Sequence, residues 1–402
     1  MALRKKLRPR KRTKAGKRKQ HPMRLSAYQI GSIDGFQRGK EAGFAQGRAE
    51  ARKNSQNVVA VIETPLPKTD VLVIAAGMIP SLEIGVIQPL QALNKQENLQ
   101  FDVKLETDVT HEMIAAANTI IFVRNVEPAA YALLELAHQL KKRTVYVIDD
   151  NFLEIQPTTP VGEYYNDPIR RETFIKFLKN TQIIKVDAPD LGSYIHERYN
   201  RHVIYFPASI DFEWLDQHGK ADKNKEQVVI GYAGGDKEED FVPVISALNQ
   251  ILDYYGGFVR LEFFGYLPPS LAEHPSVNYK GGGMDYKEFM KQLNQSSWDI
   301  GIAPLANNSF NKGKTNTKFR EYGACGIPGI YSKSPVYTHW IEQGETGYLV
   351  EHTEQHWHEG IKAMIEDPTM RQRIKENAQR TAREHFLLQT CIDNWKRHIF
   401  KT

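Results

Sequence analysis

The strongest constraint on the fold is a repeated alternation of short apolar runs with helix-compatible segments such as PLQALNKQ and AAYALLELAHQLKK. The strand-like runs of the first half are 71–77, 101–105, 119–124, 144–149, 183–187 and 203–207. Those of the second half are 228–234, 259–264, 298–304 and 328–332. Strands that alternate with helices in this way form parallel sheets with helices on both faces. The pattern predicts an α/β protein with two Rossmann-like domains.

Length and composition agree with this reading. A chain of 402 residues with 41% hydrophobic residues can bury more than one core. Its two cysteines, Cys325 and Cys391, provide neither a disulfide framework nor a metal cage, which favours a cytoplasmic protein. The longest apolar runs are about half the ~20 residues that span a bilayer, and the N-terminus lacks the apolar region of a secretory signal peptide.

The N-terminal segment 1–24 is strongly basic. Residues 1–20 contain eleven Lys or Arg and no acidic residue, whereas the rest of the chain is mildly acidic. A block of like charges with few apolar residues cannot collapse and is expected to be disordered. Three roles stay open: a solubilising tail, a peripheral anchor for anionic lipid at the inner face of the membrane, and a contact for nucleic acid or another polyanion.

A glycine repeat dominates residues 25–57. Between residues 28 and 51 a glycine recurs at every fourth position, at Gly31, Gly35, Gly39, Gly43 and Gly47. In a helix these glycines would form a slowly rotating groove that permits close backbone approach, but each costs ~1 kcal/mol. The segment is therefore either a self-association or docking helix or a loosely helical linker.

The segment 300–324 has the order expected of a nucleotide-binding βα unit. The apolar run 300–305 predicts a buried strand, 306–313 a polar loop, and 315–324 a helix with Thr315 as N-cap. Open α/β sheets bind nucleotides at the carboxyl ends of their strands. The N–H groups of Thr315 and Asn316, at the start of the helix, are suited to a diphosphate.

Three charged residues strengthen this hypothesis. Lys314, Lys318 and Glu321 are spaced i, i+4, i+7, which predicts that they share one face of the helix. Two ammonium groups suit a diphosphate, and a carboxylate one turn further along can accept both hydroxyls of a ribose. The constellation predicts a nucleotide-diphosphate ligand.

Two further loops follow predicted strands. Gly234 and Gly235 precede Lys237, so flexible backbone and one ammonium group can approach a phosphate. A surface turn with a solvated lysine is the alternative. Gly77 follows the first strand and is expected to face the donor phosphates or the acceptor.

The stretches WDIGIAPL, GKTNTKFREYGACGIPGIYS and EQGETGYLV resemble the C-terminal domain of the retaining glycosyltransferases of family 4, the group 1 glycosyltransferases of bacterial surface-polysaccharide type. These enzymes have the GT-B fold and use nucleotide-diphosphate sugars. Glu321 matches the second Glu of the family's paired-Glu motif, which holds the donor ribose. The first Glu would fall at Gly313, and the resemblance leaves Asn308, Asn311 or the loop backbone to contact the donor sugar. Some polysaccharide-building branches carry a lysine-containing loop there.

The resemblance also implies an organisation of the chain. It makes 58–208 the acceptor domain, 209–384 the nucleotide-sugar domain, and 385–402 a C-terminal helix that packs back toward the first domain. Lys237 matches a basic residue that contacts the diphosphate, and Tyr266 lies where the family places the nucleobase. The implied activity is hexosyl transfer to a glycan, lipid-linked or protein acceptor, without a cofactor or obligatory metal.

Lys237, Lys314 and Lys318 are then the catalytic residues that stabilise the leaving diphosphate. Competing motifs are weaker: the sequence GKT lacks the earlier glycine of a Walker loop, and the pair Asp149 and Asp150 favours an acceptor-side or structural role over a metal site. Two other functional classes stay open. One is a sugar-nucleotide epimerase, and the other is a non-catalytic binding or assembly protein.

Overall fold

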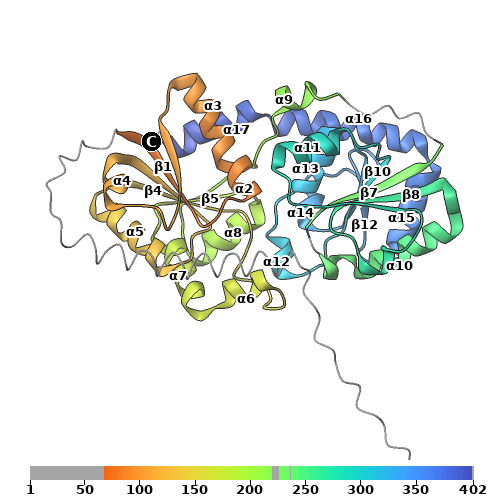
Figure 1. The fold of residues 1–402 in the computed structure, drawn as a ribbon, viewed down its shortest axis with the longest axis horizontal. Helices are drawn as coiled ribbons and strands as arrows, with labels where there is room; N and C mark the ends of the chain where they lie inside the picture. Colours follow the sequence, from red (N-terminus) through yellow and green to blue (C-terminus); the bar gives the residue numbers. More distant parts are fainter. Residues whose placement is uncertain (1–67, 220–225, 236, 401–402) are drawn as a thin grey trace, which may run out of the picture. The chain divides into compact units, whose positions relative to one another are not determined.

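The computed structural model describes residues 68–219, 226–235 and 237–400, and the statements below refer to these residues. Figure 1 shows two parallel sheets, each flanked by helices, as the alternation of strand-like and helical segments predicts. The basic segment 1–24 and the glycine repeat 25–57 lie outside the described residues, so their roles stay predictions.

The first sheet has six parallel strands in the order β2-β1-β3-β4-β5-β6. Their bounds are β1 Thr69–Ala75, β2 Phe101–Leu105, β3 Ala117–Val123, β4 Arg143–Ile148, β5 Ile183–Val186 and β6 Val203–Tyr205. The helices of this domain are α2 Pro80–Leu82, η1 Glu83–Ile87, α3 Gln88–Glu97, α4 His111–Ala116, α5 Pro128–Gln139, α6 Pro160–Asn166, α7 Pro168–Asn180 and α8 Pro189–Arg198.

The second sheet also has six parallel strands, in the order β12-β11-β10-β7-β8-β9. Their bounds are β7 Val228–Gly234, β8 Val259–Gly265, β9 Val277–Lys280, β10 Ile300–Ala303, β11 Gly329–Ser332 and β12 Tyr348–Val350. The remaining helices are α9 Phe212–Asp216, α10 Glu238–Tyr255, η2 Gly256–Phe258, η3 Pro269–Leu271, α11 Tyr286–Asn294, α12 Ser309–Lys312, α13 Thr317–Cys325, α14 Pro335–Thr338, α15 Glu354–Glu366, α16 Pro368–His385, α17 Leu388–Asn394 and η4 Trp395–Phe400.

Both faces of each sheet are buried, as expected for parallel sheets. In β3, Ile120 and Phe122 pack in the core under α5, α7 and α8, whereas Ile121 and Val123 face the opposite core under α3. This alternation is the two-residue period of a strand. The α17–η4 segment belongs to the second of these cores, where its fully buried Trp395 packs edge-on against Phe206. The last helical segment of the chain therefore packs on the first domain.

The prediction of two Rossmann-like α/β domains is confirmed, and the predicted strands match observed ones to within a few residues. The sequence pattern misses β9 and β12, which are short edge strands: β9 is mostly exposed, and β12 has only three residues. No helix among the described residues has the length and apolarity needed to cross a membrane.

Candidate functional site

A cavity of about 650 Å³ opens where strands of both sheets end. Residues that directly follow β3, β4 and β5 line it from the first domain, and the ends of β7 and β8 line it from the second. The carboxyl ends of parallel strands are the usual ligand-binding edge of open α/β sheets. Its principal polar lining residues are Ser81, Arg124, Asp149, Asp150, Asp187, Tyr286, Thr315, Thr317, Arg320 and Glu321.

A glycine brings the ends of β7 and β8 close together at this cavity. Gly265 has φ +91°, a backbone conformation that favours glycine. A Cβ on Gly265 would lie 2.4 Å from the carbonyl oxygen of Gly234. The cavity wall here is therefore bare backbone, which permits close approach of a ligand.

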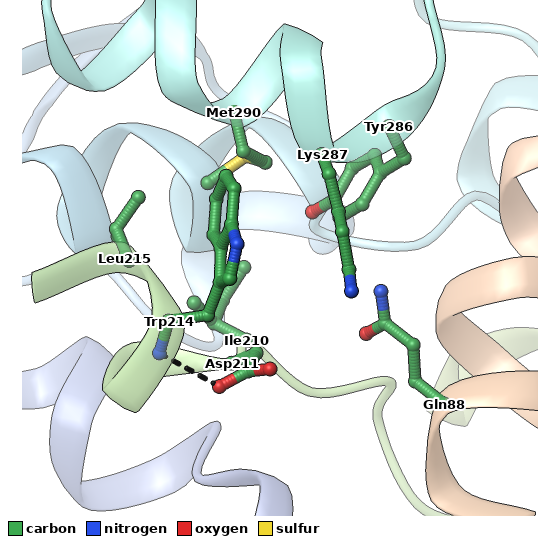
Figure 2. Close-up of a pocket in the computed structure, with 8 residues that line it drawn as sticks. All are labelled: Gln88, Ile210, Asp211, Trp214, Leu215, Tyr286, Lys287 and Met290. Carbon is green, nitrogen blue, oxygen red and sulfur yellow. Dashed lines mark hydrogen bonds between the residues drawn. The ribbon is translucent and has the colours of Figure 1, made fainter. Parts of the chain in front are cut away.

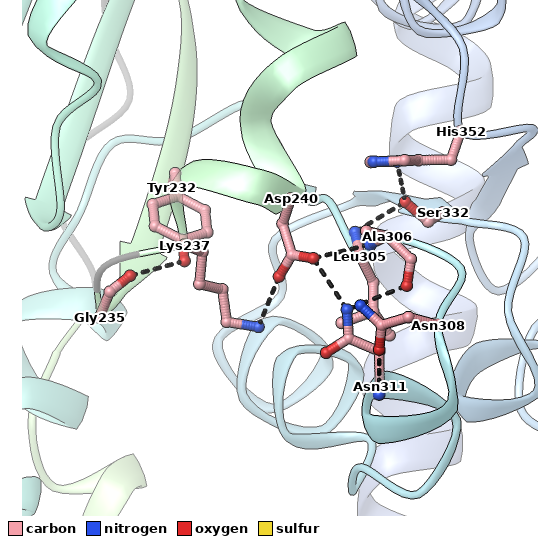
Figure 3. Close-up of polar contacts among 10 residues, drawn as sticks. All are labelled: Tyr232, Gly235, Lys237, Asp240, Leu305, Ala306, Asn308, Asn311, Ser332 and His352. Carbon is pink, nitrogen blue, oxygen red and sulfur yellow. Dashed lines mark hydrogen bonds and ion pairs between the residues drawn. The ribbon is translucent and has the colours of Figure 1, made fainter. Parts of the chain in front are cut away.

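Lys237 is positioned by a buried carboxylate (Figure 3). Its Nζ lies 3.2 Å from Oδ2 of Asp240. The other oxygen of Asp240 accepts hydrogen bonds from the backbone N–H of Ala306 at 2.7 Å and from Nδ2 of Asn311 at 2.9 Å. Asp240 thus ties the loop after β10 to the start of α10 and orients Lys237 at the same time.

Three lysines form one electropositive region. Burial lowers the pKa of Lys237 to about 8, and the positive charges of Lys314 and Lys318 contribute to that shift, while Asp240 opposes it. The influence of Lys314 and Lys318 on the pKa of Lys237 agrees with the sequence prediction that the three lysines act on the same ligand. Such a concentration of positive charge favours an anionic ligand.

The start of α13 differs from the prediction. The helix begins at Thr317 with Asn316 as its N-cap, so the prediction that Thr315 is the N-cap is wrong. The Asn316 side chain makes no capping hydrogen bond. Among the described residues, neither Thr315 Oγ1 nor Asn316 Nδ2 has a hydrogen-bond partner, although both atoms are buried. Buried polar atoms are normally paired, so these two are available to a ligand.

The predicted charged face of this helix is only partly present. Lys318 donates to Glu321 at 3.0 Å, one turn along α13, and Glu321 is 2% exposed. Lys314 precedes the helix, and its Nζ lies 4.4 Å from the ring centre of Phe310. The prediction that Lys314 shares the helix face is therefore wrong, because the chain turns before α13 begins.

The loop from Ala306 to Gly313 is more ordered than predicted. It contains the short helix α12, capped by the Asn308 side chain, which accepts from the N–H of Asn311 at 2.8 Å. Both asparagines are committed to internal hydrogen bonds. Gly313 packs against the first domain, since a Cβ there would lie 2.9 Å from Cβ of Asn151. A glutamate cannot replace Gly313 without a shift of one of these loops.

The predicted site residues separate into two groups. Those that line the cavity are Gly234, Gly235, Thr315 and Glu321. The lining does not include Lys237, Lys314, Lys318, Asn316, Tyr266 or Gly77. Tyr266 packs its ring against Phe241 in the core of the second domain. For Gly77, it is the residues just after it, from Ile79 to Ser81, that line the cavity.

The first-domain wall carries Arg124, which the site prediction omitted, beside Asp149 and Asp150, for which the sequence predicts an acceptor-side or structural role. Arg124 follows β3 with φ +57°, an uncommon conformation for a residue other than glycine, and pairs with Asp149 through two hydrogen bonds. Its Nη2 lies 3.6 Å from Oδ2 of Asp150. Burial alone would raise the pKa of Asp149, but the charge and hydrogen bonds of Arg124 outweigh it and hold that pKa below its usual value. Asp149 is thus a fixed carboxylate.

Arg320 also lies outside the predicted site, although it is adjacent to Glu321. Its side chain is fully buried, and the sequence signal for it is a pair of charged residues, Arg320 and Glu321, enclosed by the aromatic residues Phe319 and Tyr322. A separate crevice of about 20 Å³, lined by residues such as Trp214 and Lys287, has room for about one water molecule (Figure 2). It is too small for a nucleotide.

His352 and His356 each make a hydrogen bond with a nearby hydroxyl group. His352 contacts Ser332 Oγ at 2.9 Å, and burial lowers the pKa of His352. Among the described residues, no group of three His, Cys, Asp or Glu side chains could hold a metal ion.

Comparison with solved structures identifies the architecture. Anabaena HepE, solved in complex with UDP and glucose, superposes with a TM-score of 0.61 at 13% identity, over 83% of this chain and 100% of that chain. The fold is GT-B. Sucrose-phosphate synthase from Thermosynechococcus elongatus superposes with a TM-score of 0.60 at 12% identity, over 82% of this chain and 98% of that chain.

Residues 317–381 match the family model described as Glycosyl transferases group 1. The match runs from the start of α13 into α16 and includes Lys318, Arg320 and Glu321. No curated protein is similar enough in sequence to count as a match. The family match and the GT-B neighbours together support a GT-B glycosyltransferase.

Proposed function

We propose that the protein transfers a hexosyl group from a nucleotide-diphosphate sugar to a glycan, lipid-linked or protein acceptor, with retention of anomeric configuration, as in family 4. The observation that supports this proposal most strongly concerns the start of α13. There, unpartnered buried polar atoms of Thr315 and Asn316 meet a group of lysines beside a cavity of about 650 Å³. A diphosphate would satisfy both the polar atoms and the positive charge.

Each residue has a role in this mechanism. Glu321, held by Lys318, accepts hydrogen bonds from the ribose hydroxyls. Lys314, and Lys237 oriented by Asp240, stabilise the charge that develops on the diphosphate as the glycosidic bond breaks. Backbone N–H groups at the start of α13 face the same charge. The proposal requires no cofactor besides the donor substrate.

The comparisons support a sugar-nucleotide donor. HepE was solved with UDP and with UDP-glucose, and its TM-score for the latter complex is 0.60. Membrane contact through residues 1–20 and self-association through residues 28–51 stay predictions from the sequence, as does a cytoplasmic location.

A thermal-shift panel with UDP-, GDP-, ADP- and CMP-sugars tests the proposal, because a ligand that binds the folded state raises the apparent melting temperature. We expect one nucleotide to stabilise the wild-type protein and to lose its effect in Glu321→Ala. No stabilisation by any of the four would contradict the donor-site assignment and favour a non-catalytic binding protein.

A sugar-nucleotide epimerase is the second candidate. A structure described as a putative UDP-N-acetylglucosamine 2-epimerase from Listeria monocytogenes superposes with a TM-score of 0.52 at 12% identity. Conversion of the donor sugar in the absence of any acceptor, followed by NMR, would identify an epimerase. A transferase leaves the sugar configuration of unreacted donor unchanged.

A further inference from the structure

One charged side chain on the cavity wall has two buried nitrogens without a hydrogen-bond partner among the described residues. Arg320 lies on α13, next to Glu321, and its side chain is 0% exposed. Among the described residues, neither its Nε nor its Nη1 has a hydrogen-bond partner, and it forms no ion pair. The burial of an unpaired charge is strongly unfavourable, so an unpaired buried guanidinium requires an explanation.

The two acids in its neighbourhood already have cationic partners. Glu321 accepts from Lys318 at 3.0 Å. Asp187 is bound by the fully buried Lys185. Asp187 and Arg320 lie in the same region, because both influence the ionisation of Tyr205, but no salt bridge joins them. In the described part of the chain, Nε and Nη1 of Arg320 therefore have no acceptor, and the guanidinium carbon lies 6.0 Å from the ring centre of Phe386.

Arg320 is part of the cavity wall rather than of a closed core. Thr317, one turn before it on α13, lines the same cavity, as do Glu321 and Tyr286. The planar fork of an arginine matches phosphate and carboxylate oxygens through two parallel hydrogen bonds. A lysine in the same place would act only as a point charge.

We infer that Arg320 is an anion-binding residue of this cavity and binds a phosphate or carboxylate oxygen of the substrate. The inference rests on the proposed function only for the source of that oxygen, which is either the donor diphosphate or an acidic group of the acceptor. The energetic cost of an unpaired charge in the empty protein is then offset when the substrate binds.

Inorganic pyrophosphate is the ligand with which we would test this inference, by isothermal titration of the full chain. We expect Arg320→Gln and Arg320→Met to weaken pyrophosphate binding at least about tenfold, as loss of a bidentate contact should. Both variants should unfold at or above the wild-type temperature, because each removes an unpaired buried charge. Lys287→Gln is the matched control: it removes one positive charge from an exposed position outside the cavity and should leave both quantities unchanged.

Two arms of the experiment identify the source of the oxygen. If UDP competes with pyrophosphate and Arg320→Met weakens UDP but not uridine, the donor supplies it. If UDP and pyrophosphate bind together and only pyrophosphate is weakened, the acceptor supplies it. In either arm Arg320 binds an oxyanion.

Other results would overturn the inference. Wild-type affinity for pyrophosphate in both variants, or no pyrophosphate binding to the wild-type protein, would show that Arg320 binds no oxyanion. If both variants fail to fold, Arg320 is a structural residue. If pyrophosphate binding depends on Arg320 but no nucleotide binds, the proposed function alone is refuted. If nucleotides bind and the affinity for neither nucleotide nor pyrophosphate depends on Arg320, the inference alone is refuted.

Discussion

The two walls of the cavity differ in how their charged and polar side chains are paired. On the first-domain wall, Arg124 pairs with Asp149, and Asp187 pairs with Lys185. On the second-domain wall, Nε and Nη1 of Arg320 and Oγ1 of Thr315 are buried and have no hydrogen-bond partner in the described part of the chain. Both walls lie at the carboxyl ends of parallel strands, so the sheet geometry alone does not explain the difference.

This contrast distinguishes side chains that stabilise the folded protein from side chains that can bind a ligand. A charge that is paired inside the protein holds a loop in place, and removal of its partner leaves an uncompensated buried charge. A buried polar group without a partner lowers the stability of the unliganded protein. Such a group is retained where a bound ligand supplies the missing hydrogen bond. We therefore propose that the second-domain wall binds the ligand, and the following variants test that division.

The largest effect on stability is expected from Arg124→Ala. The change leaves the buried carboxylate of Asp149 without its partner, which should lower the free energy of unfolding by about 3–5 kcal/mol. Urea denaturation measures the loss. Arg320→Met provides the comparison on the opposite wall, and an equal loss in both variants would abolish the distinction between paired and unpaired walls.

The next effect concerns turnover. Lys314→Ala should lower the rate of sugar transfer by about 10² to 10³, the range typical for loss of one contact to developing charge. Steady-state kinetics with the preferred donor measure it. Lys312→Ala removes an exposed lysine only two residues away and should retain the wild-type rate. Similar rates for both variants would show that Lys314 does not act on the leaving group.

The lowered pKa of Lys237 predicts a pH dependence. In the unliganded protein Lys237 is charged below about pH 8 and loses its proton above it. A diphosphate favours the charged form, so its affinity should fall as pH rises from 8, by up to about tenfold per unit. The free energy of unfolding of the unliganded protein should rise over the same pH range, because Lys237 of the unfolded chain keeps its proton up to a higher pH.

Lys237→Arg is the control for that profile, because an arginine stays charged throughout the range. The variant should bind the diphosphate with an affinity that does not change between pH 7 and pH 9. A pH profile identical to that of the wild-type protein would assign the titration to another group.

The smallest effect on stability is expected at an uncharged contact between the two domains. Gly313→Ala places a Cβ 2.9 Å from Cβ of Asn151 and should destabilise the protein by about 1–3 kcal/mol through steric overlap. Thermal unfolding of Gly313→Ala, Asn151→Gly and the double variant forms a mutant cycle. We expect the double variant to be more stable than the sum of the single changes. Strict additivity would show that the two loops are not in contact.

The sequence predicted the parts of the site that depend on local periodicity. Alternation of apolar runs located most strands, and the residues after β7 and β10 were recognised because a buried strand ends directly before them. The start of α13 was misplaced because Asn316 and Thr315 are both acceptable N-caps, and only tertiary packing decides between them. Helix α12 was missed because its four residues give no readable period.

Contacts between distant segments could not be predicted from spacing. The pairing of Arg124 with Asp149 joins two strands, and the match between Gly313 and Asn151 joins two domains. Arg320 shows a different limit. Its charge is visible in the sequence, but the burial of its Nε and Nη1 without a hydrogen-bond partner among the described residues depends on every element packed around it. Such a residue becomes a candidate only when its surroundings are known.

The most direct test of a diphosphate site on the second-domain wall is isothermal titration with the preferred nucleoside diphosphate and with its nucleoside. The ratio of the two affinities reports the contribution of the diphosphate alone. We predict that Lys314→Ala reduces this ratio at least about tenfold, whereas Glu321→Ala weakens both ligands and leaves the ratio unchanged. The same ratio in the wild-type protein and in Lys314→Ala would contradict the account.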